Sequence, residues 1–453
     1  MRSNSNPFNR EKNERPLITL LVHTDSLEQE ILSEESSIMA IINLTKLKLL
    51  KVVFTPTENA ILKMKLANEG IEITQYEQND SYISIKSRHF EELAVCTTRE
   101  KNYKNFYNKA IFEGSKINKI DYILRDSYNY FILSKRDAFF SSSFKKQTDI
   151  EPLEVIDLIR ILLINLEHFY IATDYLVDEW YYYLYRSKKL FNEYQFAWSV
   201  VVGLSRIKKF EDVFNQFRSL LQRLEFICRA TDKTSYYALK PSNSETYSKT
   251  LYHFGYLIML ITGVFDDLAW IIQHLYCFSL EKEYPIIKIK GNSEQTKFYE
   301  QLKSKNIELY SYLIDNYTQN IIKMFYSIRN VLQHREYLDG KCIISGVNSH
   351  KNSVFSIPSC ANKFIDLVSN GNKEDFGVES GLDGEYYIQP YLFVKKATEK
   401  FAEVVNATLS KIEWSEFLEM LTQEEVDKIY ASKEKFENGI GKFLGWGVEP
   451  IYF

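Results

Sequence analysis

The chain lacks the cysteine spacing of a disulfide framework or a metal centre. No two of its five cysteines form a CxxC pair, and none stands at metal-ligand spacing from another. They are Cys96, Cys228, Cys277, Cys342 and Cys360. Scattered single cysteines are typical of reduced thiols, so we expect a cytoplasmic protein.

Segments that would direct the chain to a membrane are lacking as well. Residues 1–15 are polar, which predicts a disordered N-terminus, and they contain no apolar core of a secretory signal. The longest apolar run, 254–265, is shorter than the roughly 20 residues that cross a bilayer. We therefore expect no membrane association.

The third absence is a basic charge balance. The chain has 56 Lys and Arg against 60 Asp and Glu, which gives a net charge of −4. Proteins that hold long nucleic-acid duplexes are usually basic, and the balance argues against that class. An enzyme that captures one RNA loop needs only a local basic cleft, so the charge leaves this second class open.

What is present indicates two domains. A chain of 453 residues exceeds the usual single core, and a hydrophobic content of 45% is ordinary for a globular protein. Three runs, 17–22, 52–54 and 130–134, have the composition of buried strands and are separated by helical patterns. Such an alternation predicts a small α/β domain with a parallel sheet over residues 16–145, ending in a linker at 141–147.

Residues 146–453 are predicted to form a mainly α-helical domain, so that the whole chain belongs to the multidomain α+β class. Apolar residues recur at helical spacing in long segments, and the segment from Ile307 to the end of its predicted helix contains no Gly or Pro. The predicted helices are 155–190, 211–229, 248–278, 296–337, 390–412 and 415–437. Loops are predicted at 232–243 and 283–293. An irregular insertion is predicted near 341–389, with strand-like fragments at 342–344 and 386–388.

The helix predicted over 296–337 carries a polar constellation near its end. At about 100° per residue, Asn330 and His334 share one face, and Arg329 lies on its flank. The opposite face is apolar, with Met324, Ile328, Val331 and Leu332. A histidine exchanges protons near neutral pH, and a guanidinium offers a planar fork to phosphate oxygens. The residues fit an RNA-cleaving site, and a solvated histidine on a polar face is the alternative.

These residues resemble the motif of the HEPN superfamily of helical nucleases and nucleotide-binding proteins. That motif is an Arg, four to six residues, then a His, with a polar residue directly after the Arg. Arg329, Asn330 and His334 match it with a gap of four. The resemblance implies a metal-independent endoribonuclease that needs no cofactor, with Arg329, Asn330 and His334 as catalytic residues. It also implies RNA as substrate, a toxin or phage-defence role, and an antitoxin or other regulatory protein as partner.

A second resemblance lies in the N-terminal domain, where carboxylates stand near the ends of predicted strands. Asp25, Glu58, Asp121 and Asp137 have an order and spacing similar to the metal ligands of the PIN domain, a metal-dependent ribonuclease fold. The resemblance implies that these four residues hold Mg²⁺ or Mn²⁺. Leu27 departs from it, because the family usually has a small polar residue at this position. Solvated acidic loops are the alternative.

Two further carboxylates, Asp266 and Asp267, stand in the strongly apolar helix predicted over 248–278. Buried carboxylates are costly unless they are paired, so we expect one of them to support the motif by orienting Arg329 or His334. The alternative is that one emerges on a polar edge.

The same helix is apolar on more than one side, which predicts a homodimer formed through the helical domain. The residues behind this prediction are Leu257, Ile258, Leu260, Ile261, Val264, Phe265, Leu268 and Trp270. The function classes left open are a metal-independent nuclease, a metal-dependent nuclease acting through the N-terminal carboxylates, both together, and a non-catalytic module that binds a nucleotide or a protein.

Overall fold

The computed structural model divides the chain into two compact units, which are described separately. Unit 1 comprises Met1–Val177, Ser345–His350 and Leu444–Tyr452, and unit 2 comprises Asp178–Ile344 and Lys351–Phe443. The described residues of the first part of the chain are 18–22, 50–54, 60–68, 75–78, 82–87, 90–96, 130–138, 148–150, 157, 160–161, 163–165 and 167–172. Those of the remainder are 175–240, 243–280, 289, 296–334, 338, 340–345, 350–381 and 384–443.

The three strands predicted for a parallel sheet are confirmed in unit 1. They are β1 (Ile18–Val22), β2 (Leu50–Phe54) and β6 (Tyr130–Ala138), and β1 lies between the other two. Both pairings are parallel, with Val22 of β1 level with Phe54 of β2 and with Leu133 of β6. A fourth strand, β7 (Thr148–Ile150), pairs antiparallel with β6. The predicted linker at 141–147 lies outside the described residues.

Unit 1 also contains structure that the sequence patterns did not predict. Strands β3 (Gln75–Gln78), β4 (Tyr82–Ser87) and β5 (Phe90–Cys96) form an antiparallel three-stranded sheet. Helix α3 (Ala60–Asn68) follows β2 in the sequence. The first unit therefore combines parallel and antiparallel pairing.

The helix predicted over 155–190 is wrong as a single element. A hairpin of β8 (Phe169–Ala172) and β9 (Tyr175–Val177) interrupts it. The helical backbone ends at Glu167, whose φ of 63° leaves the helical region. The aromatic and β-branched residues that follow favour strands. Here this preference outweighs the helical spacing of the apolar residues, which predicted a helix.

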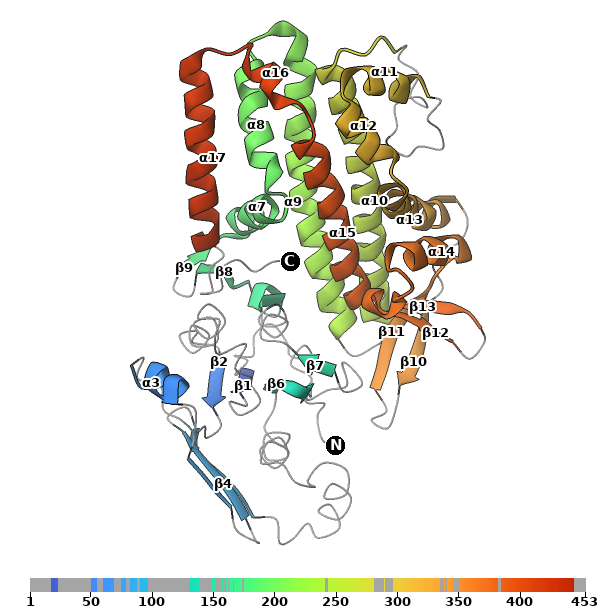
Figure 1. The fold of residues 1–453 in the computed structure, drawn as a ribbon. Coiled ribbons are helices and arrows are strands. Elements are labelled where there is room, and N and C mark those ends of the chain that lie inside the picture. The colour runs from blue at the N-terminus through green and yellow to red at the C-terminus, as the bar shows by residue number, and fades with distance from the viewer. Residues whose placement is uncertain are drawn as a thin grey trace. The chain divides into compact units, whose positions relative to one another are not determined.

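Unit 2 is a bundle built around two long helices, as Figure 1 shows. Helices α9 (Glu211–Leu239) and α10 (Ser244–Leu275) pack along their lengths, and α15 (Pro390–Ser410) lies against both. Further helices are α7 (Glu179–Leu190), α8 (Glu193–Leu204), α11 (Lys297–Lys305), α12 (Ile307–Ile314), α13 (Asn316–His334) and α14 (Ser359–Val368). Near the core centre the rings of Phe265, Phe325 and Phe401 meet at centroid distances of 5.5–6.3 Å.

The loop predicted at 232–243 is wrong over its first half, because α9 continues to Leu239. Its polar residues are buried with partners instead of being solvated. Asp232 forms an ion pair with Arg186 of α7, with 3.0 Å between Oδ1 and Nη2, and its side chain is 1% exposed. One residue earlier, the Thr231 hydroxyl lies 3.0 Å from that of Thr398 on α15. Polar residues of a type common in loops are thus paired, inside the protein, with side chains of α7 and α15.

The helix predicted over 296–337 is three helices joined at single residues. Asn306 separates α11 from α12, and Asp315 separates α12 from α13. At each joint a side-chain oxygen accepts from backbone N–H groups of the next helix: Asn306 from Leu309 at 2.7 Å, and Asp315 from Tyr317 at 2.9 Å. Both residues are preferred N-caps, and each begins the new helix where the last one ends.

The region predicted as an irregular insertion is more ordered than expected. Both strand-like fragments are confirmed, the first within β10 (Gly340–Ser345) and the second as β13 (Tyr386–Ile388). With β11 (His350–Ser356) and β12 (Val378–Ser380) they form a four-stranded sheet of order β10-β11-β13-β12. Helix α14 lies between β11 and β12 in the sequence and packs on α13. The predicted loop at 283–293 lies outside the described residues except for Ile289.

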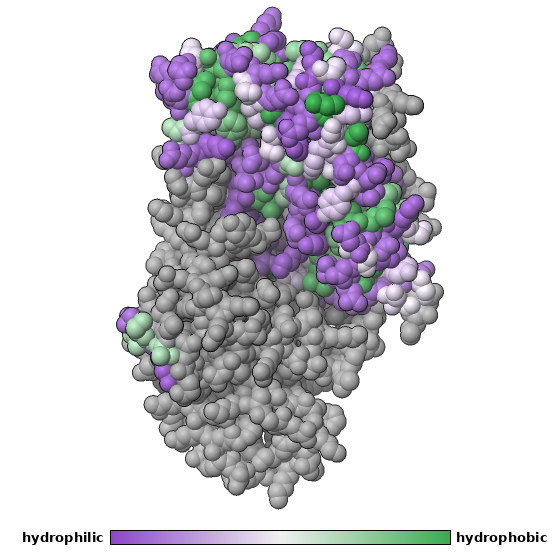
Figure 2. Space-filling view, in the orientation of Figure 1, coloured by the Kyte–Doolittle hydropathy of each residue, from purple (hydrophilic) through white to green (hydrophobic). Residues whose placement is uncertain are grey.

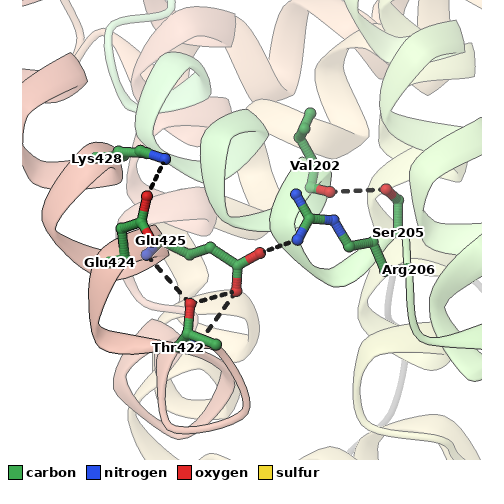
Figure 3. A network of polar contacts seen from close by, with 7 residues as sticks. All are labelled: Val202, Ser205, Arg206, Thr422, Glu424, Glu425 and Lys428. Carbon is green, nitrogen blue, oxygen red and sulfur yellow. Dashed lines mark hydrogen bonds and ion pairs between the residues drawn. The ribbon is translucent and has the colours of Figure 1, made fainter.

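The C-terminal helix predicted over 415–437 is also divided, into α16 (Trp414–Leu418) and α17 (Gln423–Phe443). Thr422 begins α17 with a reciprocal cap: its backbone N–H donates to Glu425 Oε2 at 3.1 Å, and its hydroxyl lies 3.4 Å from the Glu425 N–H. Figure 3 shows that the same carboxylate also accepts a hydrogen bond from Arg206, which follows α8. One glutamate therefore both starts α17 and ties it to α8.

Helix α10 is long and apolar enough, by length and composition, to cross a membrane. Of that apolar window, 61% is buried inside the protein. It packs against α9, α13 and α15.

The ion pair between Asp232 and Arg186 supports a first prediction. Removing one partner of a buried pair leaves an uncompensated charge, so Asp232→Ala should lower the free energy of unfolding by about 3–5 kcal/mol. Replacing both partners with apolar residues, as in Arg186→Met with Asp232→Leu, should cost much less. Urea unfolding followed by circular dichroism measures all three chains. An equal loss in the single and the double variant would contradict the account.

Candidate functional site

The predicted motif lies in the last turns of α13, and the helix extends through His334. Asn330 is exposed, Arg329 is half-buried, and Met324 and Ile328 on the opposite face are fully buried. Val331 and Leu332, which were assigned to the apolar face, are only half-buried. The side chain of His334 lies outside the described residues.

Arg329 is held beside α10 through one tyrosine. Its guanidinium carbon lies over the ring of Tyr326, 5.8 Å from the centroid. The hydroxyl of Tyr326 in turn donates to Asp266 Oδ1 of α10 at 2.7 Å and lies 3.4 Å from the carbonyl oxygen of Thr262. Asp266 therefore supports Arg329 indirectly, by fixing the ring on which the guanidinium rests.

Asp267, the neighbouring carboxylate, points to α9 instead of the motif. Its Oδ2 lies 3.2 Å from Nε of Arg223, and its side chain is 10% exposed. Among the described residues this contact is an ion pair only, and none of them donates a hydrogen bond to the buried oxygen. Arg223 reaches it across Gly263, where a Cβ atom would lie 2.2 Å from Nη1 of the arginine. The glycine is thus required for the close approach of this guanidinium.

The environment of Asp267 disfavours its charge. Burial raises the pKa of this carboxyl to about 6, Arg223 opposes the rise, and Asp266 adds to it. A carboxylate that titrates near neutral pH is one mark of functional sites, although structural ion pairs produce the same effect. Its distance along the chain from Arg329 and its α9 partner favour a structural role.

The chain passes from the middle of α10 to its start after Tyr326. Tyr326 meets Thr262, whereas the Tyr247 hydroxyl near the start of α10 donates to the carbonyl oxygen of Leu338 at 3.3 Å. Leu338, which follows α13 in the sequence, therefore lies beside the first half of α10. The sequence alone does not reveal which side chains this half of α10 exposes to solvent.

The first half of α10 exposes a stripe of large side chains, which we call the α10 stripe: Tyr252, Tyr256 and Met259. They are 70%, 43% and 36% exposed and recur at i, i+4 and i+7, the spacing of one helix face. A Cβ atom added at Gly255, beside the stripe, would meet no atom within 4 Å. The periodicity of these residues was visible in the sequence, but their exposure was not, because the rest of α10 is apolar too.

The apolar residues behind the dimer prediction are mostly covered within the chain. Leu257, Ile258, Ile261, Val264, Phe265 and Leu268 are buried, and Leu260 and Trp270 are half-buried. Helices α9, α13 and α15 cover them. On the face in Figure 2, the hydrophobic residues of the described helices form small separate groups among hydrophilic ones. The homodimer stays a prediction, and most of these residues are already covered within the chain.

The structure describes little of the predicted metal site. Asp25, Glu58 and Asp121 lie outside the described residues. Asp137 lies in β6, four positions beyond Leu133, which is level with Val22. Its side chain is not among those described. Within the described part of the chain, no group of three or more His, Cys, Asp or Glu side chains is placed to hold a metal ion.

Comparisons with protein families, with curated proteins and with solved structures find no match for this chain.

The raised pKa of Asp267 predicts a specific dependence of stability on pH. The folded pKa of Asp267, about 6, is above the ordinary value of 3.8, so folding favours the protonated carboxyl. Its contribution to the stability of the fold is therefore complete below pH 3.8 and is lost as the pH rises through 6. Asp267→Asn, which stays neutral, should therefore be more stable than the native chain above that range, by up to about 3 kcal/mol. Thermal unfolding measured from acid to neutral pH tests this. Asp427→Asn, at an exposed position of α17, is the matched control, and parallel pH curves for the native and Asp267→Asn chains would contradict the prediction.

Proposed function

We propose that this protein is a metal-independent endoribonuclease that cleaves RNA through Arg329, Asn330 and His334. The observation that carries the proposal is the placement of Arg329: its guanidinium rests on Tyr326, which Asp266 fixes to the helix core, while Asn330 beside it is exposed. A charged fork held at the surface by a buried anchor is suited to phosphate oxygens. A toxin or defence effector is the class of protein in which we expect this activity.

The mechanism follows from the side chains and from RNA itself. The ribose 2′-OH attacks the adjacent phosphorus, the P–O5′ bond breaks, and a 2′,3′-cyclic phosphate and a 5′-OH result. His334 would accept the 2′-OH proton or donate a proton to the departing 5′-oxygen. Arg329 would stabilise the negative charge of the transition state with paired N–H donors, and Asn330 would hold the phosphate. The other proton passes to or from water, or a second copy of the chain.

A second candidate is a metal-dependent nuclease in unit 1. It is favoured by the confirmed parallel strands: the register places the ends of β1 and β2 level with Leu133, from which β6 continues to Ala138, and such folds bind ligands at this edge of the sheet. Asp25, Glu58, Asp121 and Asp137 would hold Mg²⁺ or Mn²⁺ there. In this candidate the motif of α13 has no catalytic part.

RNA cleavage with and without EDTA separates these functions. Cleavage that persists in EDTA and leaves a 2′,3′-cyclic phosphate supports the first proposal. EDTA-sensitive cleavage that leaves a 5′-phosphate supports the second. An intact RNA under both conditions would favour a module that binds a nucleotide or a regulatory protein without catalysis.

His334→Ala should reduce the rate of metal-free cleavage at least a hundredfold, because one positioned acid–base group contributes about 10²–10⁴. The rate is measured on a labelled RNA in EDTA, and circular dichroism verifies that the helices remain. Gln333→Ala, which changes the exposed neighbour on the same helix, is the control and should cleave at the native rate. Native activity in His334→Ala would exclude the proposed mechanism.

Arg329→Lys should separate charge from geometry. The lysine keeps the positive charge but loses the bidentate fork and the contact of the guanidinium with the Tyr326 ring. We expect turnover to fall by about two orders of magnitude or more, while affinity for a non-cleavable 2′-deoxy analogue falls much less. Equal losses of affinity and turnover would make Arg329 a substrate anchor and not a group that acts in the transition state.

A further inference from the structure

Four aromatic rings form a continuous cluster where the last turns of α9 meet the first turns of α10. We call Tyr236, Tyr237, Tyr252 and His253 the ring cluster. Tyr237 stacks on His253 with centroids 5.6 Å apart and planes within 3°. Tyr236 meets Tyr237 at 5.3 Å, and Tyr252 meets His253 at 5.2 Å. Tyr252, the most exposed large hydrophobic residue described, belongs both to this cluster and to the α10 stripe.

Lysines surround the ring cluster. Lys240 Nζ lies 5.1 Å from the ring centroid of Tyr236, and Lys249 Nζ lies 5.3 Å from that of Tyr237. A third lysine, Lys233, is close enough to influence His253. Glu245 pairs with Lys249 across one helix turn and is the acidic group that acts on Lys240. Lys240 and Lys249 outnumber Glu245 among these described groups, so the edge of the cluster carries a positive balance.

The titration of the cluster reflects this balance. Burial lowers the pKa of His253, and the positive charges of Lys233 and Lys249 lower it further. Burial likewise lowers the pKa of Lys240, with Lys249 adding to the effect and Glu245 opposing it. The cations repel one another, and an anion bound beside them would relieve that repulsion.

We propose that the ring cluster and its lysines bind unpaired nucleotides of single-stranded RNA. The exposed ring of Tyr252, held against the half-buried rings of the cluster, offers a flat face on which a base stacks, and lysines at the edge of the rings attract the adjoining phosphates. Only unpaired bases have free faces, so a duplex does not use this surface. The acidic overall balance of the chain agrees with a local site for a strand.

The positive balance distinguishes RNA from an apolar partner. A protein helix docked on the α10 stripe would cover Tyr252 and Tyr256 but would gain nothing from Lys240 and Lys249, whose ammonium groups lie over the neighbouring rings. RNA uses both sets of groups. The stripe also leads from the ring cluster along α10 toward Thr262, whose carbonyl oxygen lies beside Tyr326 of α13. In the proposed nuclease a strand held on the cluster would extend toward Arg329; this role rests on the proposed function, whereas the affinity for RNA does not.

Fluorescence anisotropy with a short labelled 2′-O-methyl oligouridine tests the binding surface. This probe lacks the 2′-OH nucleophile, so its affinity is measured whether or not the chain cleaves RNA. Tyr252→Ala should weaken binding about tenfold or more, the loss expected for one stacked base, and Tyr252→Phe should restore most of it. Lys240→Gln with Lys249→Gln should lower the slope of log affinity against log salt by about 0.7 for each phosphate that the two lysines neutralise in the native chain.

Helix α17 supplies matched controls. Lys428 pairs with Glu424 across one turn as Lys249 pairs with Glu245, and Tyr430 is 51% exposed. Lys428→Gln and Tyr430→Ala should bind the oligouridine as the native chain does. An equal loss in these controls would show diffuse attraction to the whole surface and would overturn the proposal.

Two further outcomes would overturn it. Unchanged affinity in Tyr252→Ala, with the native circular dichroism spectrum, excludes stacking at this site. A shift of Tyr252→Ala from dimer to monomer in light scattering, without loss of RNA affinity, would assign the surface to a second copy of the chain. The result is separable from the proposed function: weaker binding in Tyr252→Ala supports the surface even if the chain cleaves nothing, and His334-dependent cleavage with unchanged binding refutes the surface alone.

Discussion

The helical unit depends on the burial of one helix, α10, which is apolar on nearly every side. Removing apolar area from water is the main favourable term in folding, and α9, α13 and α15 each cover part of this helix. Of its large hydrophobic residues, only those of the stripe, Tyr252, Tyr256 and Met259, stay exposed. The ring cluster lies at one end of this stripe because the other sides of the helix are occupied.

Polar residues inside the bundle fix how its helices are arranged. Apolar contacts tolerate small shifts between helices, whereas a buried ion pair or hydroxyl pair does not, because an unsatisfied polar group is costly. Asp232 with Arg186 sets α7 against α9, and Thr231 with Thr398 sets α9 against α15. Tyr326 with Asp266 does the same for α13 and α10, so the position of Arg329 follows from a contact made inside the protein.

The sequence predicted the elements whose composition and periodicity indicate the same secondary structure. It failed at elements that depend on contacts with residues distant in the sequence. The three parallel strands and the helical character of residues after 178 were predicted from composition and periodicity. The continuation of α9 through Asp232 was not, because its partner Arg186 lies far away in the sequence. For the site, periodicity placed Asn330 on the exposed face of α13, but the Tyr326–Asp266 contact and the exposure of Tyr252 require the packing of whole helices.

The joints at Asn306 and Asp315 impose a length constraint on the chain. Each joint connects two helices through one residue whose side chain caps the following helix. Neither joint has further loop residues that could accommodate an insertion. One residue added within the following helix would rotate everything after it by about 100° and advance it by about 1.5 Å. In α13 such a rotation would turn Arg329 away from α10 and bring a buried apolar side toward water. Insertions and deletions between residues 306 and 334 are therefore the changes that this part of the chain tolerates least.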